Sequence, residues 1–464
     1  MILLGAIFGN LMLRDQAANA HPSRQNAGMQ GMPTGITPMQ PMPGMAAKMG
    51  NNGAMGPLPC LNSAAPPLCY SPQQLRQAYG VTALLNAGIT GKGRIITIID
   101  AFQSPTIRTD LQLFDKVFGL KDPQLNIITP FGLTPFNAKD PNQTGFAGEI
   151  SLDVEWAHAM APDATIDLVL ANVKNETIQG QLSALLQAIN FAVVNNMGSV
   201  ISMSFGVGET CLSMNFIHNA HQTFKKARAQ HQTLFASAGD SGAAVIQCQN
   251  GQPVTLDQGS NFPASDPLVT SVGGTKLLAS PAGNYMSEMA WNESQRGAGA
   301  TGGGVSKIFP QPAFQKNIIQ SNTRAISDIA IDADPLTGVP VVTSSLKPGQ
   351  TLIIPVGGTS IGAPVAAGMV ALLDQAAGGK RLGFLNSGLY RLSQNTTAYG
   401  KAFHDVKTGN NTFVFQAGNG QVVTIPGFKA VAGWDPPTGL GSPDTFNMSK
   451  LLPQFIKADD GADL

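Results

Sequence analysis

The stretch IITIID at residues 95–100 is a short, continuous apolar run of the kind that forms a fully buried strand. Similar runs follow it: TIDLVLA at 165–171, SVISMSF at 199–205 and TLFASAG at 233–239. Segments with the amphipathic pattern of helices lie around them, at about 106–118, 149–161, 177–196 and 213–229. Strands that alternate with helices predict an α/β fold, a doubly wound and mostly parallel sheet with helices on both faces.

Three polar side chains follow these apolar runs. Asp100, Ser204 and Asp240 each stand where a predicted strand ends. In open α/β sheets, sites gather beyond the carboxyl ends of the strands, so we expect these side chains to line one cleft. The regular alternation continues over residues 70–455, which we interpret as one large domain, followed by a short tail at 456–464.

The composition excludes several classes of protein. The 28 Lys plus Arg balance 28 Asp plus Glu, so no basic field exists to hold nucleic acid. Only 12% of residues are charged, a pattern that suits an exported protein working in acid, because few native ion pairs are lost when carboxylates become protonated. The 4 cysteines form no CxxC or Cys/His cluster, which argues against structural zinc.

The amino-terminal segment differs from the rest of the chain. Residues 1–20 contain an apolar stretch that ends in a small-x-small sequence, which predicts a secretory signal peptide, although it lacks a basic flank. Residues 21–69 are rich in Pro, Gly and Met, and we expect a flexible leader. In an oxidising compartment Cys60 could pair with Cys69, and Cys211 with Cys248; the sequence alone allows three pairings. No later segment has the length of a membrane span.

The segment GEISLDVEWAHAMAP places Glu149 and Asp153 four residues apart, on one helix face with Trp156 and Met160. Burial and mutual repulsion raise the pKa of at least one of two carboxyl groups on a buried face. A carboxyl group with a tuned pKa can act as a general base in acid. A helix in a wet cleft with no catalytic role is the alternative. The opposite face, which we expect to be polar and exposed, carries Ser151, Glu155 and His158.

Two further motifs suggest chemistry. In GGTSIGAP, Ser360 opens a helix, and the small residues around it give a substrate backbone room to approach a nucleophile. A simple N-cap is the alternative role for such a serine. In SAGDSG, Asp240 follows a strand between small residues, and a protonated carboxyl there could donate a hydrogen bond to an oxyanion. Ordinary turn formation is the alternative for this aspartate.

Motifs from residue 70 to 455 resemble the sedolisin family of serine-carboxyl peptidases: GEISLDVEWAHAMAP, SMSFG, SAGDSG, NFPASDPLVTSVGGT, TGGGVSKIFPQP, SDIAIDADPLTG, GGTSIGAP and GWDPPTGLGSP. The resemblance implies a subtilisin-like fold in which glutamate replaces the catalytic histidine, and cleavage of peptide bonds in acid. It implies that Ser360 is the nucleophile, Glu149 its general base, Asp153 the carboxylate that orients Glu149, and Asp240 the oxyanion-hole acid. These roles agree with those argued from the residues alone.

The resemblance also implies substrate-binding residues. Ser204, Phe205 and Gly206 match the strand that lines the primary specificity pocket, and Gly303 is expected to let substrate backbone pass. The family commonly has tryptophan where Phe205 stands, which puts in doubt any indole hydrogen bond to the carboxylate network that includes Asp100.

The resemblance further implies one structural calcium ion near the carboxyl end of the chain, in AFHDVKTGNN and VAGWDPPTGLGSPD. The implied ligands are the carboxylates of Asp405 and Asp435, with the carbonyl oxygens of Val406, Val431 and Gly433, plus water. Two aspartates in loops, taken alone, are more often turn formers.

Competing functions fit the sequence less well. A subtilisin-type triad needs a histidine in a Gly-rich turn, and none of the 6 histidines stands in one. An esterase would need a GxSxG elbow around Ser360, which is absent. A catalytically silent surface-binding homologue would explain why fewer residues precede the domain than in prodomain-bearing sedolisins. We expect a secreted, monomeric endopeptidase acting on polypeptides, with tripeptidyl-peptidase action open and no stable membrane insertion.

Overall fold

The computed structural model describes residues 58, 60–61, 68–174, 177–347 and 349–456, with the backbone of 40–41 and 47–48. Its centre is an eight-stranded sheet in which every pairing is parallel except that of the edge strand β13. The strands run in the order β13 (Tyr285–Ala290), β12 (Thr270–Ala279), β8 (Thr233–Ser237), β6 (Val200–Met203), β3 (Ile95–Ala101), β5 (Thr165–Ala171) and β4 (Leu125–Ile128), with β16 (Ile329–Asp332) also paired to β12. The predicted strands and the mostly parallel sheet are confirmed.

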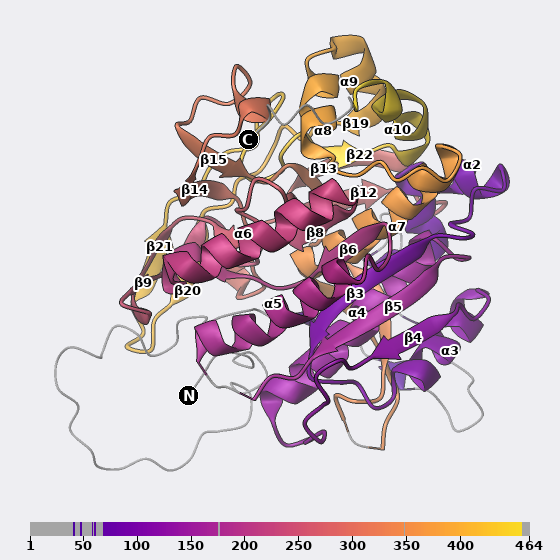
Figure 1. Cartoon of the computed structure of the whole chain (residues 1–464), viewed down its shortest axis with the longest axis horizontal. Helices are drawn as coiled ribbons and strands as arrows, with labels where there is room; N and C mark the ends of the chain where they lie inside the picture. Colours follow the sequence, from indigo (N-terminus) through magenta and orange to yellow (C-terminus); the bar gives the residue numbers. More distant parts are fainter. Residues whose placement is uncertain are drawn as a thin grey trace.

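Helices cover both faces of this sheet, as predicted (Figure 1). On one side lie α3 (Ile107–Phe118), α4 (Pro141–Met160) and α7 (Gly362–Ala376), and on the other α5 (Ile178–Val194) and α6 (Met214–Ala229). Side chains of one strand alternate between the two cores: Ile96 and Ile98 pack with α4 and α7, whereas Ile99 packs with α5 and α6. Burial on both faces explains why the strands are almost continuously apolar.

Smaller elements surround this core. The paired strands are β7 (Val207–Gly208) with β11 (Asn261–Phe262), β9 (Ala244–Gln249) with β10 (Gln252–Gln258), β14 (Gly304–Pro310) with β15 (Thr323–Ile326), β17 (Val339–Thr343) with β18 (Leu352–Gly357), β19 (Phe403–His404) with β22 (Ser442–Pro443), and β20 (Phe413–Gln416) with β21 (Val422–Ile425). The remaining helices are α1 (Pro72–Ala78), α2 (Val81–Asn86), α8 (Asn386–Ser393), α9 (Thr396–Ala402) and α10 (Thr445–Leu451). Short 3-10 turns are η1 (Glu209–Cys211), η2 (Ser294–Arg296), η3 (Ala313–Gln315), η4 (Thr359–Ile361) and η5 (Leu452–Gln454). Within the described ranges, none of the helices has the length and apolar character needed to span a bilayer.

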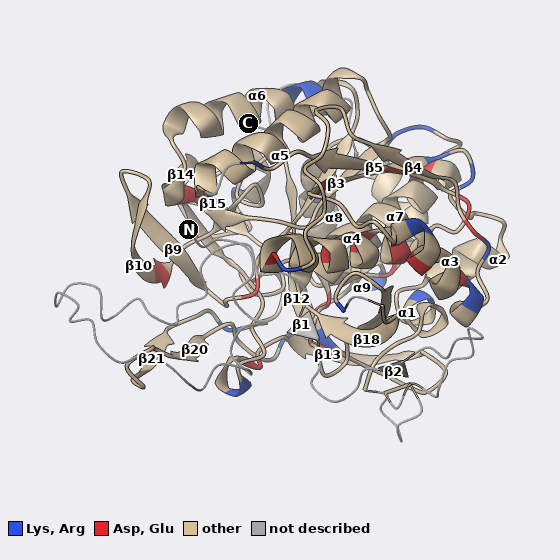
Figure 2. Ribbon diagram, turned by 90° about the horizontal axis from the view of Figure 1, so that it is seen from below, with Lys and Arg blue, Asp and Glu red and all other residues tan. Residues whose placement is uncertain are grey.

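Helix α4 differs from its prediction, because it is buried on every side. Ser151, Glu155 and His158, which we expected on an exposed face, are all fully buried. The prediction was wrong because α3 and β17 cover that face. Oε2 of Glu155 accepts a hydrogen bond from the backbone N–H of Val342 at 3.0 Å, and Nε2 of His158 lies 3.0 Å from Oδ1 of Asp115. Acidic residues are marked on both α3 and α4 in Figure 2.

The part of the expected leader that the structure describes is attached to the domain. Strands β1 (Gln40–Pro41) and β2 (Ala47–Lys48) pair antiparallel with β18, which differs from the expectation of a flexible spacer. Leu58 is buried, and the expected disulfides Cys60–Cys69 and Cys211–Cys248 are both formed. The predicted signal peptide at 1–20 and the tail beyond residue 456 lie outside the described residues.

Candidate active site

Ser360 lies in the turn η4, between the end of β18 and the start of α7. The preceding Gly358 has φ 125°, a conformation that glycine adopts without strain. A Cβ atom on Gly358 would come within 2.9 Å of Oδ2 of Asp240, so only a residue without a side chain permits this approach. Gly358 therefore allows close packing of the serine turn against the aspartate, whereas room for a substrate backbone stays a prediction.

Asp240 follows the carboxyl end of β8 and is bound to the turn that carries Ser360. Its Oδ1 accepts hydrogen bonds from both the backbone N–H and the hydroxyl of Thr359, each at 2.8 Å. The Thr359 hydroxyl in turn accepts from the backbone N–H of Gly239 at 3.0 Å. Thr359, which sequence reasoning did not single out although it stands in the quoted GGTSIGAP motif, thus fixes the direction of the Asp240 carboxyl.

Glu149 and Asp153 lie in the middle of α4, which packs against η4. Both side chains are buried, with exposures of 2% and 0%. Ser204, directly after β6, connects this helix to the serine turn, because its hydroxyl lies 2.9 Å from Oδ1 of Asp153 and 3.3 Å from the carbonyl oxygen of Ser360. Side chains from three separate parts of the chain therefore meet around Ser360.

Asp100 adds a third buried carboxyl group to this region. Within the described part of the chain, neither of its carboxyl oxygens has a hydrogen-bond partner. Burial raises the pKa of Asp100 well above its usual range, and the charge of Glu149 raises it further. Burial likewise raises the pKa of Asp153, followed by the charges of Asp100 and Glu149, while the Ser204 hydroxyl acts in the opposite direction. The group is built to hold protons rather than three negative charges.

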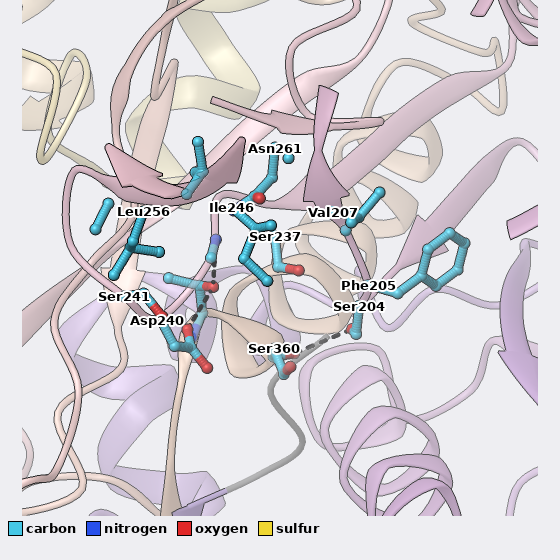
Figure 3. A pocket seen from close by; sticks show the side chains of 16 residues that line it. Ser204, Phe205, Val207, Ser237, Asp240, Ser241, Ile246, Leu256, Asn261 and Ser360 are labelled. Carbon is cyan, nitrogen blue, oxygen red and sulfur yellow. Dashed lines mark hydrogen bonds between the residues drawn. The ribbon is translucent and has the colours of Figure 1, made fainter. Parts of the chain in front are cut away.

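A pocket opens beside Ser360 (Figure 3). It is lined by Ser204, Phe205, Gly206, Val207, Gly208, Ser237, Gly239, Asp240, Ser241, Ala244, Val245, Ile246, Leu256, Asn261, Thr359 and Ser360. The ring of Phe205 points away from Ser360 in Figure 3 and belongs to the apolar core. Phenylalanine has no ring N–H, so this side chain does not replace the hydrogen bond that a tryptophan indole could donate to the carboxyl groups.

The structure brings most of the predicted site residues together. Of the predicted catalytic and substrate-binding residues, those that line the pocket are Ser204, Phe205, Gly206, Asp240 and Ser360. Glu149, Asp153 and Gly303 do not line it. A Cβ atom on Gly303 would come within 2.0 Å of the carbonyl oxygen of Pro436, so close packing accounts for this glycine. Its contact with substrate stays a prediction. Sequence reasoning missed the wall formed by β9 and β10, since no motif marks it and only the apolar run AAVI at 243–246 hints at it.

The predicted calcium ligands come from two adjacent loops. Asp405 and Asp435 are close enough that, after burial, the charge of Asp405 contributes to raising the pKa of Asp435 to about 7. The backbone N–H of Gly433 contacts both carboxyl oxygens of Asp405, at 3.1 and 3.2 Å. No hydrogen bond within the described residues is directed at the carbonyl oxygens of Val406, Val431 or Gly433. Two facing carboxylates with spare carbonyl oxygens form a donor set that fits a hard cation.

Comparisons with known proteins agree with this architecture. A model of the subtilase family matches residues 138–420. Kumamolisin from Bacillus sp. (strain MN-32) is 35% identical over 414 residues, covering 87% of this chain and 68% of its own length. Sedolisin from Pseudomonas sp. (strain 101) is 33% identical over 389 residues, covering 82% of this chain and 61% of its own. Tripeptidyl-peptidase 1 from Canis lupus familiaris is 28% identical over 422 residues, covering 84% and 65%.

A solved structure of Pseudomonas sedolisin, a serine-carboxyl proteinase complexed with two molecules of pseudo-iodotyrostatin, superposes with a TM-score of 0.68 at 27% identity. The match covers 85% of this chain and 99% of that chain. A subtilisin-like α/β fold is thus common to both. The chain belongs to the sedolisin family of serine-carboxyl peptidases.

Proposed function

We propose that this protein is a secreted, calcium-stabilised endopeptidase that hydrolyses peptide bonds in acid through an acyl-enzyme on Ser360. The observation that carries the proposal is the meeting of Ser360, Asp240 and the Ser204–Asp153 hydrogen bond at one pocket above the sheet. Secretion is supported by the two disulfides, which form and persist in oxidising compartments.

In the proposed mechanism, Oγ of Ser360 attacks the scissile carbonyl carbon while Glu149 takes the hydroxyl proton. The carbonyl oxygen becomes an oxyanion and accepts a hydrogen bond from protonated Asp240, whose Oδ1 is already occupied by Thr359. Glu149 then gives its proton to the leaving amine, and the acyl bond to Ser360 is hydrolysed by water in the reverse sequence. Asp153 acts as a positioning residue for Glu149, and Ser204 holds Asp153.

Acid dependence follows from the same carboxyl groups. Glu149 must be ionised to accept a proton, whereas Asp240 must be protonated to donate one. Raised pKa values at Asp100 and Asp153 keep protons on these two groups, so that an ionised Glu149 does not face two neighbouring negative charges. As the pH rises, the cluster loses these protons and the oxyanion loses its donor. Activity should therefore be confined to acid.

The test is cleavage of an unfolded protein between about pH 3 and 7, comparing the unmodified chain with Ser360→Ala. We expect acid-confined activity that the substitution abolishes while the fold, measured by circular dichroism, remains. Peptides with blocked amino termini separate internal cleavage from removal of tripeptides, since only an endopeptidase accepts them. A folded chain that cleaves nothing at any pH, or a fully active Ser360→Ala, would refute the proposal.

Calcium, where bound, would be held by Asp405 and Asp435 with the carbonyl oxygens of Val406, Val431 and Gly433, and would offset the repulsion between the two carboxylates. A ligand at 100 times its Kd stabilises a fold by about 2.7 kcal/mol. We therefore expect calcium to raise the unfolding temperature by several degrees, and a chelator or Asp435→Asn to remove this increase. An unfolding temperature indifferent to calcium would refute this part of the proposal.

A further inference from the structure

The pocket beside Ser360 has two walls that come from separate parts of the chain. One wall is the segment 204–208, which joins β6 to β7. The other is the β9–β10 hairpin, which contributes four apolar residues: Ala244, Val245, Ile246 and Leu256. Asp240 is the sole charged residue among those that line the pocket. Such walls suit a large apolar side chain and leave a charged one without a partner.

Backbone hydrogen bonds hold the base of the β9–β10 hairpin. There the N–H of Gly259 donates to the carbonyl of Ala243 at 3.2 Å, and the N–H of Ala244 donates to Ser241, next to Asp240, at 3.0 Å. Farther along, most of β10 is exposed, with Leu256 as its one buried side chain. Strand β9 is mostly buried. A two-stranded hairpin is only marginally stable by itself, so its position depends on its contacts with other elements.

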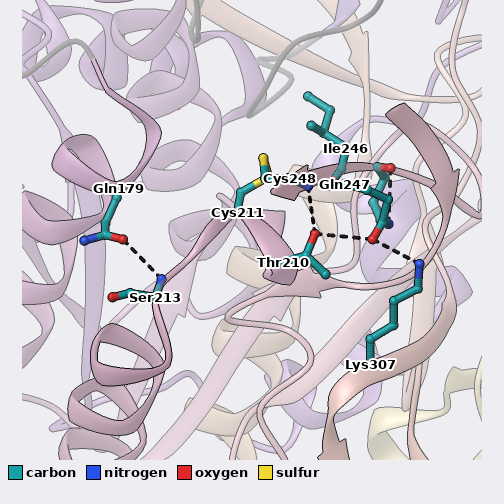
Figure 4. Close-up of a disulfide and its surroundings, with 9 residues drawn as sticks. Gln179, Thr210, Cys211, Ser213, Ile246, Gln247, Cys248 and Lys307 are labelled. Carbon is teal, nitrogen blue, oxygen red and sulfur yellow. Dashed lines mark hydrogen bonds between the residues drawn. A yellow bond between two sulfur atoms is a disulfide. The ribbon is translucent and has the colours of Figure 1, made fainter. Parts of the chain in front are cut away.

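The disulfide Cys211–Cys248 supplies the main contact (Figure 4). It joins η1, at the end of the first wall, to β9 in the second, with 4.7 Å between the two Cα atoms. Beside it, the N–H of Cys248 donates to the Thr210 hydroxyl at 3.1 Å. The two backbones approach closely here, because a Cβ atom on Gly208 would lie 2.0 Å from the carbonyl oxygen of Ile246.

The turn η1 is itself firmly held, which makes it a fixed anchor for the disulfide. Glu209 is buried, and its carboxyl accepts hydrogen bonds from the Ser306 hydroxyl, at 2.8 Å, and from the backbone N–H of Lys307, both in β14. The ammonium of Lys307 reaches back to Oε1 of Gln247 in β9 at 3.0 Å. The disulfide therefore connects the hairpin, whose strand β10 is mostly exposed, to a firmly held turn, with Lys307 as a weaker second link.

We infer that the Cys211–Cys248 disulfide determines substrate specificity, by holding the hairpin wall where Ile246 and Leu256 contact a large apolar side chain of the residue before the scissile bond. This inference rests on the proposed function. The two cysteines are positioning residues and touch no reacting atom. Without the disulfide the hairpin moves away from Val207, and the apolar contacts are lost. Ser360 and Asp240 keep their geometry, because Thr359 and the base of the hairpin remain in place.

The test compares two variants that each lose one disulfide. Cys211→Ser/Cys248→Ser opens the pocket wall, whereas Cys60→Ser/Cys69→Ser removes the disulfide at residues 60–69, which lines no part of the pocket. The substrates are blocked peptides that differ only in having Phe or Ala before the scissile bond. For the pocket variant we expect kcat/KM for the Phe peptide to fall about tenfold through KM, while the Ala peptide changes by less than about twofold. The control variant should keep the Phe-over-Ala ratio, even if its unfolding temperature falls.

An unchanged Phe-over-Ala ratio in the folded pocket variant would overturn the inference. If that variant does not fold, the Cys60→Ser/Cys69→Ser variant is compared before and after reduction of its one remaining disulfide, and reduction should lower the ratio in the same way. If the unmodified chain cleaves no peptide, the proposed function has failed. The role of the disulfide in shaping the pocket can still be tested by peptide binding. Calorimetry on Ser360→Ala, with product peptides ending in Phe or Ala, should then show tighter binding of the Phe peptide only when Cys211 and Cys248 are present. Equal binding of both peptides would overturn the inference.

Discussion

Helix α4 carries two groups of buried carboxyls that look alike by burial and differ in their partners. Toward Ser360 lie Glu149 and Asp153, with Asp100 from β3. Toward α3 and β17 lies Glu155, with Asp110 and Asp115 from α3. Burial is the first cause of a raised pKa at Asp100 and Asp153 in the first group, and at all three carboxyls of the second. A shifted pKa alone therefore does not distinguish a site from a structural network.

The partners make the distinction. In the second group, Asp110 accepts from the N–H and hydroxyl of Ser344, at 3.0 and 2.6 Å. Glu155 accepts from the N–H of Val342 at 3.0 Å, and Asp115 faces His158 at 3.0 Å. In the first group, Asp100 has no hydrogen-bond partner within the described residues, and the group borders the pocket through Ser204. Pairing is incomplete in both groups, since Oε1 of Glu155 also has no hydrogen-bond partner within the described residues. What sets the first group apart is its connection, through Asp153 and Ser204, to the turn that carries Ser360.

The strongest test of the difference between the two groups is to make the same substitution in each. Glu149→Gln should lower kcat/KM by about 1000-fold, because an amide cannot take the Ser360 proton. Glu155→Gln, six residues along the same helix, should leave kcat/KM unchanged. Peptide cleavage at the optimum pH measures both, with circular dichroism to show that each variant is folded. Equal losses in the two variants would mean that the helix carries no base distinct from its structural carboxyls.

A smaller effect is expected at Asp240. Asp240→Ala removes the oxyanion donor and should lower kcat by about 100- to 1000-fold. Asp240→Asn keeps Oδ1 for Thr359 and replaces the acid O–H with an amide N–H. We expect it to retain more activity than the alanine variant, with a pH profile extended toward neutral, because its donor needs no bound proton. If the two variants were equally impaired with unchanged profiles, Asp240 would not be the oxyanion donor.

The free energy of unfolding should depend on the second group of carboxyls more than on the first, which is the reverse of the expectation for activity. Glu155→Ala leaves the buried N–H of Val342 without its acceptor and should lower the free energy of unfolding by about 1 to 3 kcal/mol. Asp100→Asn loses no hydrogen bond and should leave that free energy unchanged or raised. Urea unfolding at neutral pH measures both. A larger loss of stability in Asp100→Asn than in Glu155→Ala would contradict the assignment of the two groups.

The sequence was sufficient for one group and misleading for the other. Periodicity located the sheet and its helices, because fully buried strands leave an unmistakable apolar run. Four-residue spacing predicted that Glu149 and Asp153 share a buried face, and both are buried. The same spacing wrongly assigned Glu155 and His158 to solvent, since an amphipathic pattern does not reveal that α3 and β17 cover the polar face. The β9–β10 wall of the pocket was likewise missed, because no motif marks these strands, although the disulfide that joins β9 to η1 was expected.

The two groups should act together in the pH dependence of stability. A carboxyl whose pKa is higher in the folded than in the unfolded state holds its proton more tightly in the folded state. Its contribution to the free energy of unfolding is therefore fully present below about pH 4, and it is lost as the pH rises through the folded-state pKa. Asp100, Asp110, Asp115, Asp153 and Glu155 all have this direction. The unfolding free energy should thus be greater at about pH 4 than at pH 7, by roughly 1.4 kcal/mol for each tenfold difference in proton affinity between the folded and unfolded states. Glu155→Gln, which removes one such group without removing its acceptor oxygen, should flatten the dependence, and stability that rises toward neutral pH would contradict the assignment.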